Sequence, residues 1–408
     1  MKTFSKYIIS KLIECRNHTK YFDKTIDPII TRESEGCNII AIGDIHGDIQ
    51  LMIDTLTIGK VIKKTDKENI NTIQINRKDK NESIEYYEWI GKNTIVVQVG
   101  DQIDRCRPTD KKFSNCKEQN VTYDDEASDI EILLFFTNLH IKASAVKDGS
   151  AVYSLLGNHE LMNIIGDIRY VSYKNLEQLD VNDDEENKDQ DINKEVIDVT
   201  NEDYTNNISN FIKRRKNIFR REGILAKFIA CTRYSILIVN GYLFVHGGVL
   251  GSYINQTYNL QDLNNKIKDF IMNKKDKKTE KEITNFIFNA DSPFYTRKLG
   301  NIKKNTSLND CTDVQNIINS FKNININLKG IIVGHTPHLD GINGTCKQND
   351  KNTLFRIDVA SSKAFKYVLN NEKNPQAKAQ VLKISNNDET EILQFENGIN
   401  DEIKSTPI

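Results

Sequence analysis

The sequence predicts an α/β fold, because short apolar runs alternate with amphipathic helical patterns and several runs end in polar turns that contain glycine. The apolar runs are rich in β-branched residues and have the length that is typical of buried strands. They lie at residues 37–42, 94–99, 151–156, 235–239, 242–245, 330–333 and 354–359.

Two segments between these runs have the spacing of helices. In residues 48–61 and 128–146, apolar side chains recur at positions that share one helical face. Ser128 is a predicted N-cap of the second helix, because its hydroxyl can accept a hydrogen bond from a backbone amide of the first turn. Asp129 and Glu131 follow in that turn, where acidic side chains are favourable.

Composition excludes several classes of protein. The chain has 408 residues with 56 basic and 57 acidic side chains, and this balance does not indicate a nucleic-acid partner. No apolar stretch reaches the roughly 18 residues of a membrane span, so no membrane partner is predicted. The amino-terminal residues lack the features of a secretory signal peptide, and we therefore expect a cytoplasmic protein.

The cysteines support the same location. Seven occur, which is an odd number, and none form a CxxC pair. This pattern favours a reducing compartment and argues against a disulfide framework or a cysteine-rich zinc site.

Polar residues follow five of the predicted strands, at the point where each strand ends. These blocks are residues 43–48, 100–105, 157–160, 246–248 and 334–338, and they contain five of the seven histidines of the chain. In open α/β sheets, the carboxyl edge of the strands is where ligands bind. A concentration of histidines at that edge indicates a metal site, which scattered structural histidines would not produce.

The residue types suit two divalent ions. Asp and His are ligands for Mn, Fe or Zn. A carboxylate such as Asp101 can bridge two ions about 3.5–4 Å apart, and such a pair activates a water for in-line displacement at phosphorus. The predicted ligands are Asp44, His46, Asp101, Asn158, His246 and His335.

The five blocks, in this order, resemble the calcineurin-like metallophosphoesterase superfamily. They are most similar to its phosphoprotein phosphatase branch and, within that branch, to the Shewanella-like protein phosphatases, as are residues 157–171, 291–297, 356–365 and 380–384. The resemblance implies an αββα sandwich in which two central mixed β-sheets are flanked by helices.

The resemblance also implies a role for each site residue. Asp44, His46 and Asp101 would hold one metal, and Asp101, Asn158, His246 and His335 would hold the other. His159 would be the general acid that protonates the leaving oxygen, oriented by Asp104. Arg105 would grip the phosphoryl group and Arg297 would be a second clamp. His338 is expected to be a bystander.

The sequence departs from the family pattern after Arg105, where the family usually has glycine and this chain has Cys106. Cys116 lies ten residues further on. A redox-sensitive pair is conceivable, but two unrelated thiols are the favoured interpretation. Arg107 could add a positive charge near the phosphate.

The function implied by the resemblance is hydrolysis of phosphomonoesters with two divalent metals, of which Mn is expected and Fe or Zn are alternatives. A Ser/Thr protein phosphatase that acts on a phosphoprotein is favoured, although some relatives prefer phosphotyrosine. One alternative is a diadenosine tetraphosphatase or other nucleotide phosphoesterase, since fold and metals do not separate these activities. Another is a catalytically silent binding protein. The sequence does not indicate the oligomeric state.

The expected organisation is one catalytic domain at residues 36–385, preceded by a helical extension at 1–35 and followed by a tail at 386–408. Residues 62–92 are expected to form a polar hairpin insertion, and the acidic residues 180–206 a flexible one. The basic residues 213–216 are predicted to lie on a solvated helix face, with a docking surface as the alternative.

Overall fold

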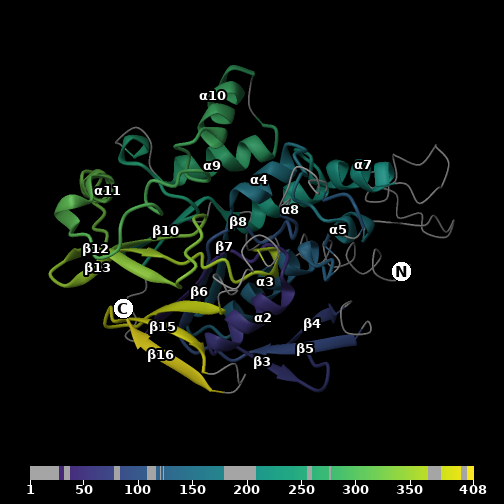
Figure 1. Cartoon of the computed structure of the whole chain (residues 1–408), viewed down its shortest axis with the longest axis horizontal. Helices are drawn as coiled ribbons and strands as arrows, with labels where there is room; N and C mark the ends of the chain where they lie inside the picture. The colour runs from purple at the N-terminus through teal and green to yellow at the C-terminus, as the bar shows by residue number, and fades with distance from the viewer. Residues whose placement is uncertain are drawn as a thin grey trace.

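The structure is a computed structural model of the whole chain (Figure 1). It describes residues 27–31, 37–77, 83–107, 116–119, 121–122, 124–178, 208–254, 260–274, 277–365, 378–396 and 402–408. Most of the predicted extension at 1–35 and the whole acidic insertion at 180–206 lie outside the described residues.

The first sheet has seven strands. They are β2 (Asn38–Ile42), β6 (Thr94–Gln98), β7 (Ala151–Leu155), β8 (Arg233–Tyr234), β14 (Gln380–Ile384), β15 (Thr390–Phe395) and β16 (Ile403–Pro407). Their order is β16-β15-β14-β2-β6-β7-β8. Because β2, β6, β7 and β8 are parallel, their carboxyl ends share one edge of the sheet.

The second sheet has six strands. They are β1 (Ile29–Ile30), β9 (Ile236–Val239), β10 (Tyr242–Val245), β11 (Gly330–Val333), β12 (Asn343–Gln348) and β13 (Lys351–Arg356). Their order is β1-β9-β10-β11-β13-β12, and β10, β11 and β13 are parallel. All seven strands predicted from the apolar runs are present in the two sheets, with ends shifted by a few residues.

Along the chain, the described helices lie between these strands. The α-helices are α2 (Ile49–Ile58), α3 (Asp129–Ala145), α4 (Asn158–Ile164), α5 (Tyr173–Glu177), α7 (Ile208–Phe219), α8 (Ile224–Thr232), α9 (Leu260–Ile271), α10 (Lys277–Phe288) and α11 (Thr312–Lys322). Short 3-10 helices are η2 (Gly251–Tyr253), η3 (Leu308–Asp310) and η4 (Lys363–Phe365).

The two sheets pack face to face. Ile39 and Val97 of the first sheet share an apolar cluster with Phe244 and Ile332 of the second. Full burial of such a side chain contributes about 1.5–3 kcal/mol. Because side chains alternate along a strand, the other face of each sheet needs a separate cover.

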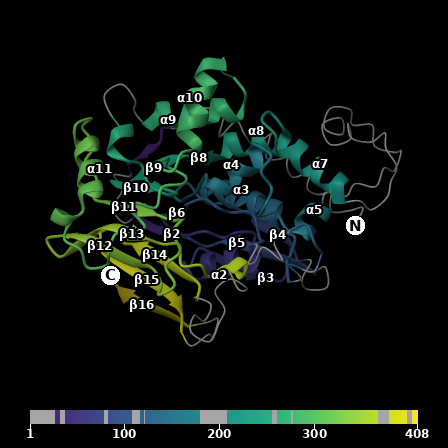
Figure 2. The same cartoon turned by 45° about the horizontal axis from the view of Figure 1, so that its top comes forward.

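Helices supply that cover. On the outer face of the first sheet, Ile40 packs in one cluster with Leu56 of α2 and Phe136 of α3. On the outer face of the second sheet, Leu243 packs with Leu263 of α9 and Ile317 of α11 (Figure 2). The predicted αββα sandwich is confirmed.

Residues 62–92 form more than the predicted hairpin. They contain β3 (Ile62–Thr65), β4 (Thr72–Arg77) and β5 (Ser83–Trp89), which make an antiparallel sheet in the order β3-β5-β4. Ile73 and Tyr87 pack against Phe135 of α3 in the apolar cluster that covers the first sheet. The insertion is therefore part of the core, at the lower right of Figure 1.

Residues 386–408 also differ from the prediction of a tail. β15 pairs with β14, and β16 pairs with β15, so this segment extends the first sheet by two strands (Figure 2). The sequence signal was weak because this edge of the sheet is half-buried or exposed, as at Glu391 and Lys404, and its strands lack a continuous apolar run.

Both predicted helices form, and their caps differ. Asp48 accepts a hydrogen bond at 3.0 Å from the amide of Leu51 and so caps α2. Ser128 is the N-cap residue of α3 but makes no such bond with its side chain. The amide of Asp129 instead donates to the side chain of Asn175 at 3.0 Å, so a residue distant in sequence does the work of a local cap.

The structure corrects the prediction about cysteines. Cys106 is bonded to Cys116 and Cys311 to Cys346, and the Cα atoms of each pair are 5.9 Å apart. Of the other described cysteines, Cys37 and Cys231 form no disulfide. Sequence spacing contains no information on how chain folding brings thiols together. The expected lack of disulfides was a reason to predict a reducing compartment, and these two disulfides remove that reason.

The Cys311–Cys346 bond is expected to stabilise the fold measurably. The two residues are 35 positions apart, and closing a loop of this size raises the free energy of unfolding by about 3–4 kcal/mol. Cys311→Ala should therefore lower the midpoint of urea unfolding. If reduction with dithiothreitol leaves the unfolding of the unmodified protein unchanged, and thiol titration finds every cysteine reduced, the pairing is contradicted.

No helix among the described residues is long and apolar enough to cross a membrane.

Candidate active site

The predicted blocks meet at the carboxyl edge of both sheets. Asp44, Asp101 and Asn158 follow β2, β6 and β7, while His246 and His335 follow β10 and β11. Because the strands are parallel within each group, the chain must leave them at the same edge. All six predicted ligands are buried there.

Asp101 lies at the centre of this group. Its Oδ2 atom is 3.3 Å from Nε2 of His246 and 3.8 Å from Nε2 of both His46 and His159. Two sets of side chains have potential ligand atoms within 4.8 Å of one another, and Asp101 belongs to both. One set is His46, Asp101 and His159, and the other is Asp101, His246 and His335. The geometry agrees with a bridging position for this carboxylate.

Hydrogen bonds on the far side of the rings orient two of the imidazoles. Nδ1 of His246 lies 2.9 Å from the carbonyl oxygen of Val99, and Nδ1 of His46 lies 3.4 Å from that of Ile103. A carbonyl can only accept, so Nδ1 carries a proton, and Nε2, which faces the centre, can present a lone pair to a metal once it is unprotonated. This is the usual support of a metal-binding histidine.

Glu160 holds the Asp101 turn in place. Its carboxylate accepts hydrogen bonds from the amides of Asp101 at 3.0 Å, Gln102 at 2.8 Å and Gly157 at 2.7 Å. Glu160 lies in the predicted block at residues 157–160, but the sequence pattern indicates no role for it. A fully buried carboxylate that binds three amides joins the loops after β6 and β7 into one unit.

The backbone at the site is strained. His46, Asp101, Asp104 and His335 have φ values of 50°, 54°, 75° and 65°, in the left-handed region that residues other than glycine rarely adopt. Each such residue costs about 1–3 kcal/mol and persists only where surrounding contacts enforce it. The same conformation occurs elsewhere among the described residues, as at Lys60 and Glu222, so it does not by itself mark the site.

The electrostatics of the centre favour cations. Burial, with the nearby Asp358 carboxylate, raises the pKa of Asp44 well above its ordinary value, and burial raises the pKa of Asp358 to about 6. Burial disfavours the imidazolium of His246, but Asp101 and Asp44 outweigh burial and raise its pKa to about 9. Several buried carboxylates beside neutral ring nitrogens fit divalent metal ions, which would neutralise the carboxylates and displace such protons.

His159 and Asp104 form the predicted pair. Nδ1 of His159 is 2.7 Å from Oδ2 of Asp104, which leaves Nε2 directed toward the Asp101 side. Asn163 donates to both oxygens of Asp104 at 3.0 and 3.1 Å, and Arg215 donates to Asn163 at 3.0 Å. Arg215 also binds Asp129 at 2.8 Å. The carboxylate that orients His159 is therefore itself held by a buried network.

Arg215 corrects the prediction for the basic segment. Arg215 is fully buried and Arg214 nearly so, and a solvated face holds neither of them. The signal was present in α7, because Phe211, Arg215 and Phe219 are spaced by four and share one helical face with buried apolar residues. An arginine on the same helical face as two core aromatics indicates a side chain that packs into the interior.

Removal of Arg215 should destabilise the protein strongly. Arg215→Met leaves Asp129 buried without its ion pair, and breaking a buried pair costs about 3–5 kcal/mol. Urea unfolding at neutral pH measures the loss. Arg220→Met is the matched control because Arg220 is exposed near the end of the same helix, and it should change the free energy of unfolding by less than about 0.5 kcal/mol. Equal effects of the two substitutions would contradict the network.

The two predicted phosphate clamps, Arg105 and Arg297, differ in burial. Arg105 is fully buried, with Nε 3.7 Å from Glu126 and a terminal nitrogen 3.5 Å from Asp124. Arg297 is exposed and donates to the carbonyl oxygen of His335 at 2.7 Å, which places it at the rim. His338 contributes no ring atom to either candidate metal set.

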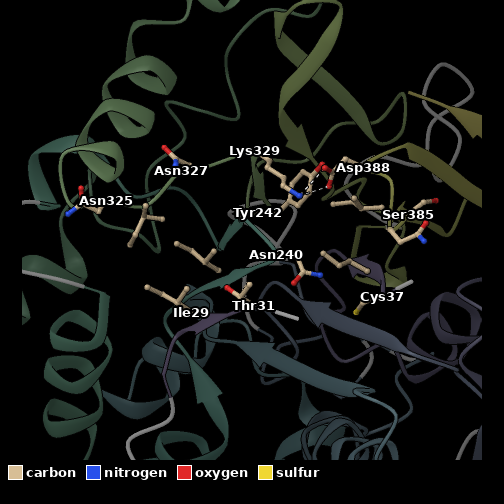
Figure 3. A pocket seen from close by; sticks show the side chains of 16 residues that line it. Ile29, Thr31, Cys37, Asn240, Tyr242, Asn325, Asn327, Lys329, Ser385 and Asp388 are labelled. Carbon is tan, nitrogen blue, oxygen red and sulfur yellow. Dashed lines mark hydrogen bonds and ion pairs between the residues drawn. The ribbon is translucent and has the colours of Figure 1, made fainter. Parts of the chain in front are cut away.

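A separate cavity of about 550 Å³ lies at the opposite ends of the same strands (Figure 3). Cys37 and Tyr242, which adjoin or begin β2 and β10, line it, and an ion pair between Lys329 and Asp388 lies beside Tyr242. It contains none of the predicted site residues, so it is not the metal centre.

Comparison with known proteins agrees with this geometry. The sequence model described as calcineurin-like phosphoesterase matches residues 37–339, which is most of the chain and includes every predicted metal ligand. The chain belongs to the calcineurin-like phosphoesterase family. This calcineurin-like phosphoesterase therefore comes from a group whose members use divalent metals, and its buried donor set fits them.

Two relatives show where in this family the chain has similar sequences. An uncharacterised protein of Acanthamoeba polyphaga mimivirus is 34% identical over 271 residues, which cover 62% of this chain and 95% of that one. Shewanella-like protein phosphatase 2 of Arabidopsis thaliana is 27% identical over 346 residues, covering 82% of this chain and 73% of that one. The resemblance to Shewanella-like phosphatases is confirmed.

Solved structures share the fold. A cold-active protein-tyrosine phosphatase of a psychrophilic Shewanella species superposes with a TM-score of 0.53 and 17% identity, covering 93% of this chain and 82% of that one. At this identity the likeness concerns the fold alone.

Proposed function

We propose that this calcineurin-like phosphoesterase is a metal-dependent phosphatase that hydrolyses phosphomonoesters, and that its substrates are phosphoserine and phosphothreonine residues of proteins. The observation that supports this best is the Asp101 carboxylate among three imidazoles, with the His159–Asp104 pair at 2.7 Å beside it. A bridging ligand next to a positioned acid suits hydrolysis at phosphorus.

In this proposal each side chain has one task. Two divalent ions, with Mn expected, would supply Lewis acidity at the phosphoryl oxygens and a lowered pKa of water. They would be held by Asp44, His46, Asp101, Asn158, His246 and His335. His159, as the doubly protonated imidazolium, donates its Nε2 proton to the leaving oxygen, while Asp104 accepts a hydrogen bond from Nδ1 and fixes the orientation of the ring.

The protein substrate is supported by the named relatives. Shewanella-like protein phosphatase 2 matches over most of both chains, whereas no observation in the described structure favours a nucleotide. Phosphoserine and phosphothreonine follow from the family to which the motifs are most similar. Phosphotyrosine is the competing residue preference, because the solved Shewanella enzyme is a protein-tyrosine phosphatase.

An activity panel with the manganese-loaded full chain tests the proposal. The substrates are matched phosphoserine, phosphothreonine and phosphotyrosine peptides and diadenosine tetraphosphate. We expect higher kcat/KM for the first two than for the others. Faster turnover of diadenosine tetraphosphate than of any peptide would overturn the protein substrate. No turnover, together with less than about one bound ion per chain, would favour a silent binding protein.

A further inference from the structure

Arg107 lies at the reaction centre, although the family pattern assigns phosphate binding to the residue two positions earlier. A terminal nitrogen of Arg107 is 3.5 Å from Nε2 of His159, the atom that faces the centre. Its guanidinium carbon is 5.3 Å from the ring centre of Tyr170 and 5.0 Å from that of Phe365.

Several contacts fix the Arg107 guanidinium in this position. One terminal nitrogen donates to the carbonyl oxygens of Asp104 at 2.9 Å and Cys106 at 3.0 Å. The amide of Cys106 donates to the carbonyl oxygen of Tyr170 at 3.0 Å, and the Cys106–Cys116 disulfide holds the same turn. The other terminal nitrogen therefore remains directed toward His159.

Arg105 does not occupy an equivalent position. Its side chain is fully buried and faces the carboxylates of Glu126 and Asp124. Glu126 is also paired with Lys363, so this arginine belongs to a buried ion cluster beneath the site. Nε and one terminal nitrogen of Arg105 have no hydrogen-bond partner among the described residues, whereas the Arg107 guanidinium is held by two carbonyl oxygens and reaches Nε2 of His159.

We propose that Arg107, clamped between Tyr170 and Phe365, is the arginine that binds the phosphoryl dianion of the substrate in this protein. The inference rests on the proposed phosphatase function and deepens it. His159 in the first turn of α4 and Arg107 in the loop after β6 converge, and an anion between them would accept hydrogen bonds from both. Cation–π contacts with the two rings pre-orient the guanidinium for such binding and lower the entropy lost on binding.

Phosphate affinity tests the proposal independently of turnover. The probe is inorganic phosphate, titrated calorimetrically into the manganese-loaded full chain. Arg107→Met keeps an unbranched side chain between the two rings and removes the charge, and it should weaken phosphate binding tenfold or more. Arg107→Lys keeps the charge without the planar guanidinium, and its phosphate affinity should lie between those of the unmodified protein and Arg107→Met. The KM for p-nitrophenyl phosphate should rise in the same order.

Arg169→Met is the matched control, because Arg169 is exposed, pairs with Asp167 and lies next to Tyr170 in sequence. It should change phosphate affinity by less than twofold. If Arg107→Met, folded as judged by its circular dichroism, keeps phosphate affinity within twofold, or if Arg105→Met alone loses it, the proposal is wrong. Arg107-dependent phosphate binding without turnover of any phosphoester would support the proposal and reject the phosphatase function.

Discussion

Replacing Asp101 with asparagine should remove metal and activity together. Oδ2 of Asp101 lies within 3.8 Å of three imidazoles, so the substitution takes away both a potential ligand and the negative charge that the two candidate metal sets share. Loss of several kcal/mol of charge stabilisation corresponds to a fall in kcat/KM of about three orders of magnitude. Metal content by elemental analysis should fall in parallel.

The fold should survive this substitution. Asp101 has a φ of 54°, and asparagine is among the residues that tolerate the left-handed region. Asp66→Asn is the control. Asp66 is exposed directly after β3 and belongs to neither candidate metal set, and the substitution removes the same charge. Full metal content and unchanged turnover in Asp101→Asn would contradict a central role for this carboxylate.

Replacing His159 with alanine should lower turnover about 10²–10⁴-fold, the usual contribution of a general acid. The loss should be smaller for p-nitrophenyl phosphate than for a phosphoserine peptide, because nitrophenolate leaves readily without a proton. Metal content should stay at about two ions per chain. His338→Ala is the control, since that ring belongs to neither candidate metal set.

The same variant separates two roles that the geometry allows. His159 lies in one of the two sets of potential ligands, with its Nε2 3.8 Å from Asp101. If His159→Ala loses about one ion per chain and acts equally poorly on both substrates, His159 is a ligand. Its bond to Asp104 at 2.7 Å would then orient a metal ligand, which such carboxylates also do.

The strands that were predicted from continuous apolar runs agree with the structure. Buried strands such as 330–333 were recognisable because continuous apolar residues of this length have no other stable environment. The predicted ligands come together because they follow parallel strands directly, as Asp44 follows β2 and His335 follows β11. Weakly apolar edge strands such as β16 were missed, because half of their surface faces solvent.

Long side chains and thiols were beyond the reach of the sequence. Arg105 and Arg107 are two positions apart and have the same chemistry, yet one joins a buried ion cluster and the other reaches His159. Their directions depend on side-chain torsions that packing selects. The Cys311–Cys346 bond likewise depends on two segments that meet only when the second sheet is complete.

The sequence by itself therefore determined the sandwich and the place where the predicted metal ligands gather, since both follow from short apolar strands and from the residues at their carboxyl ends. Only the tertiary structure decided what surrounds those ligands: the Glu160 clasp, the Arg215 network behind Asp104 and the arginine that faces the reaction centre. Strand ends converge by topology alone, whereas the partners of a buried charge are set by every element that packs around it.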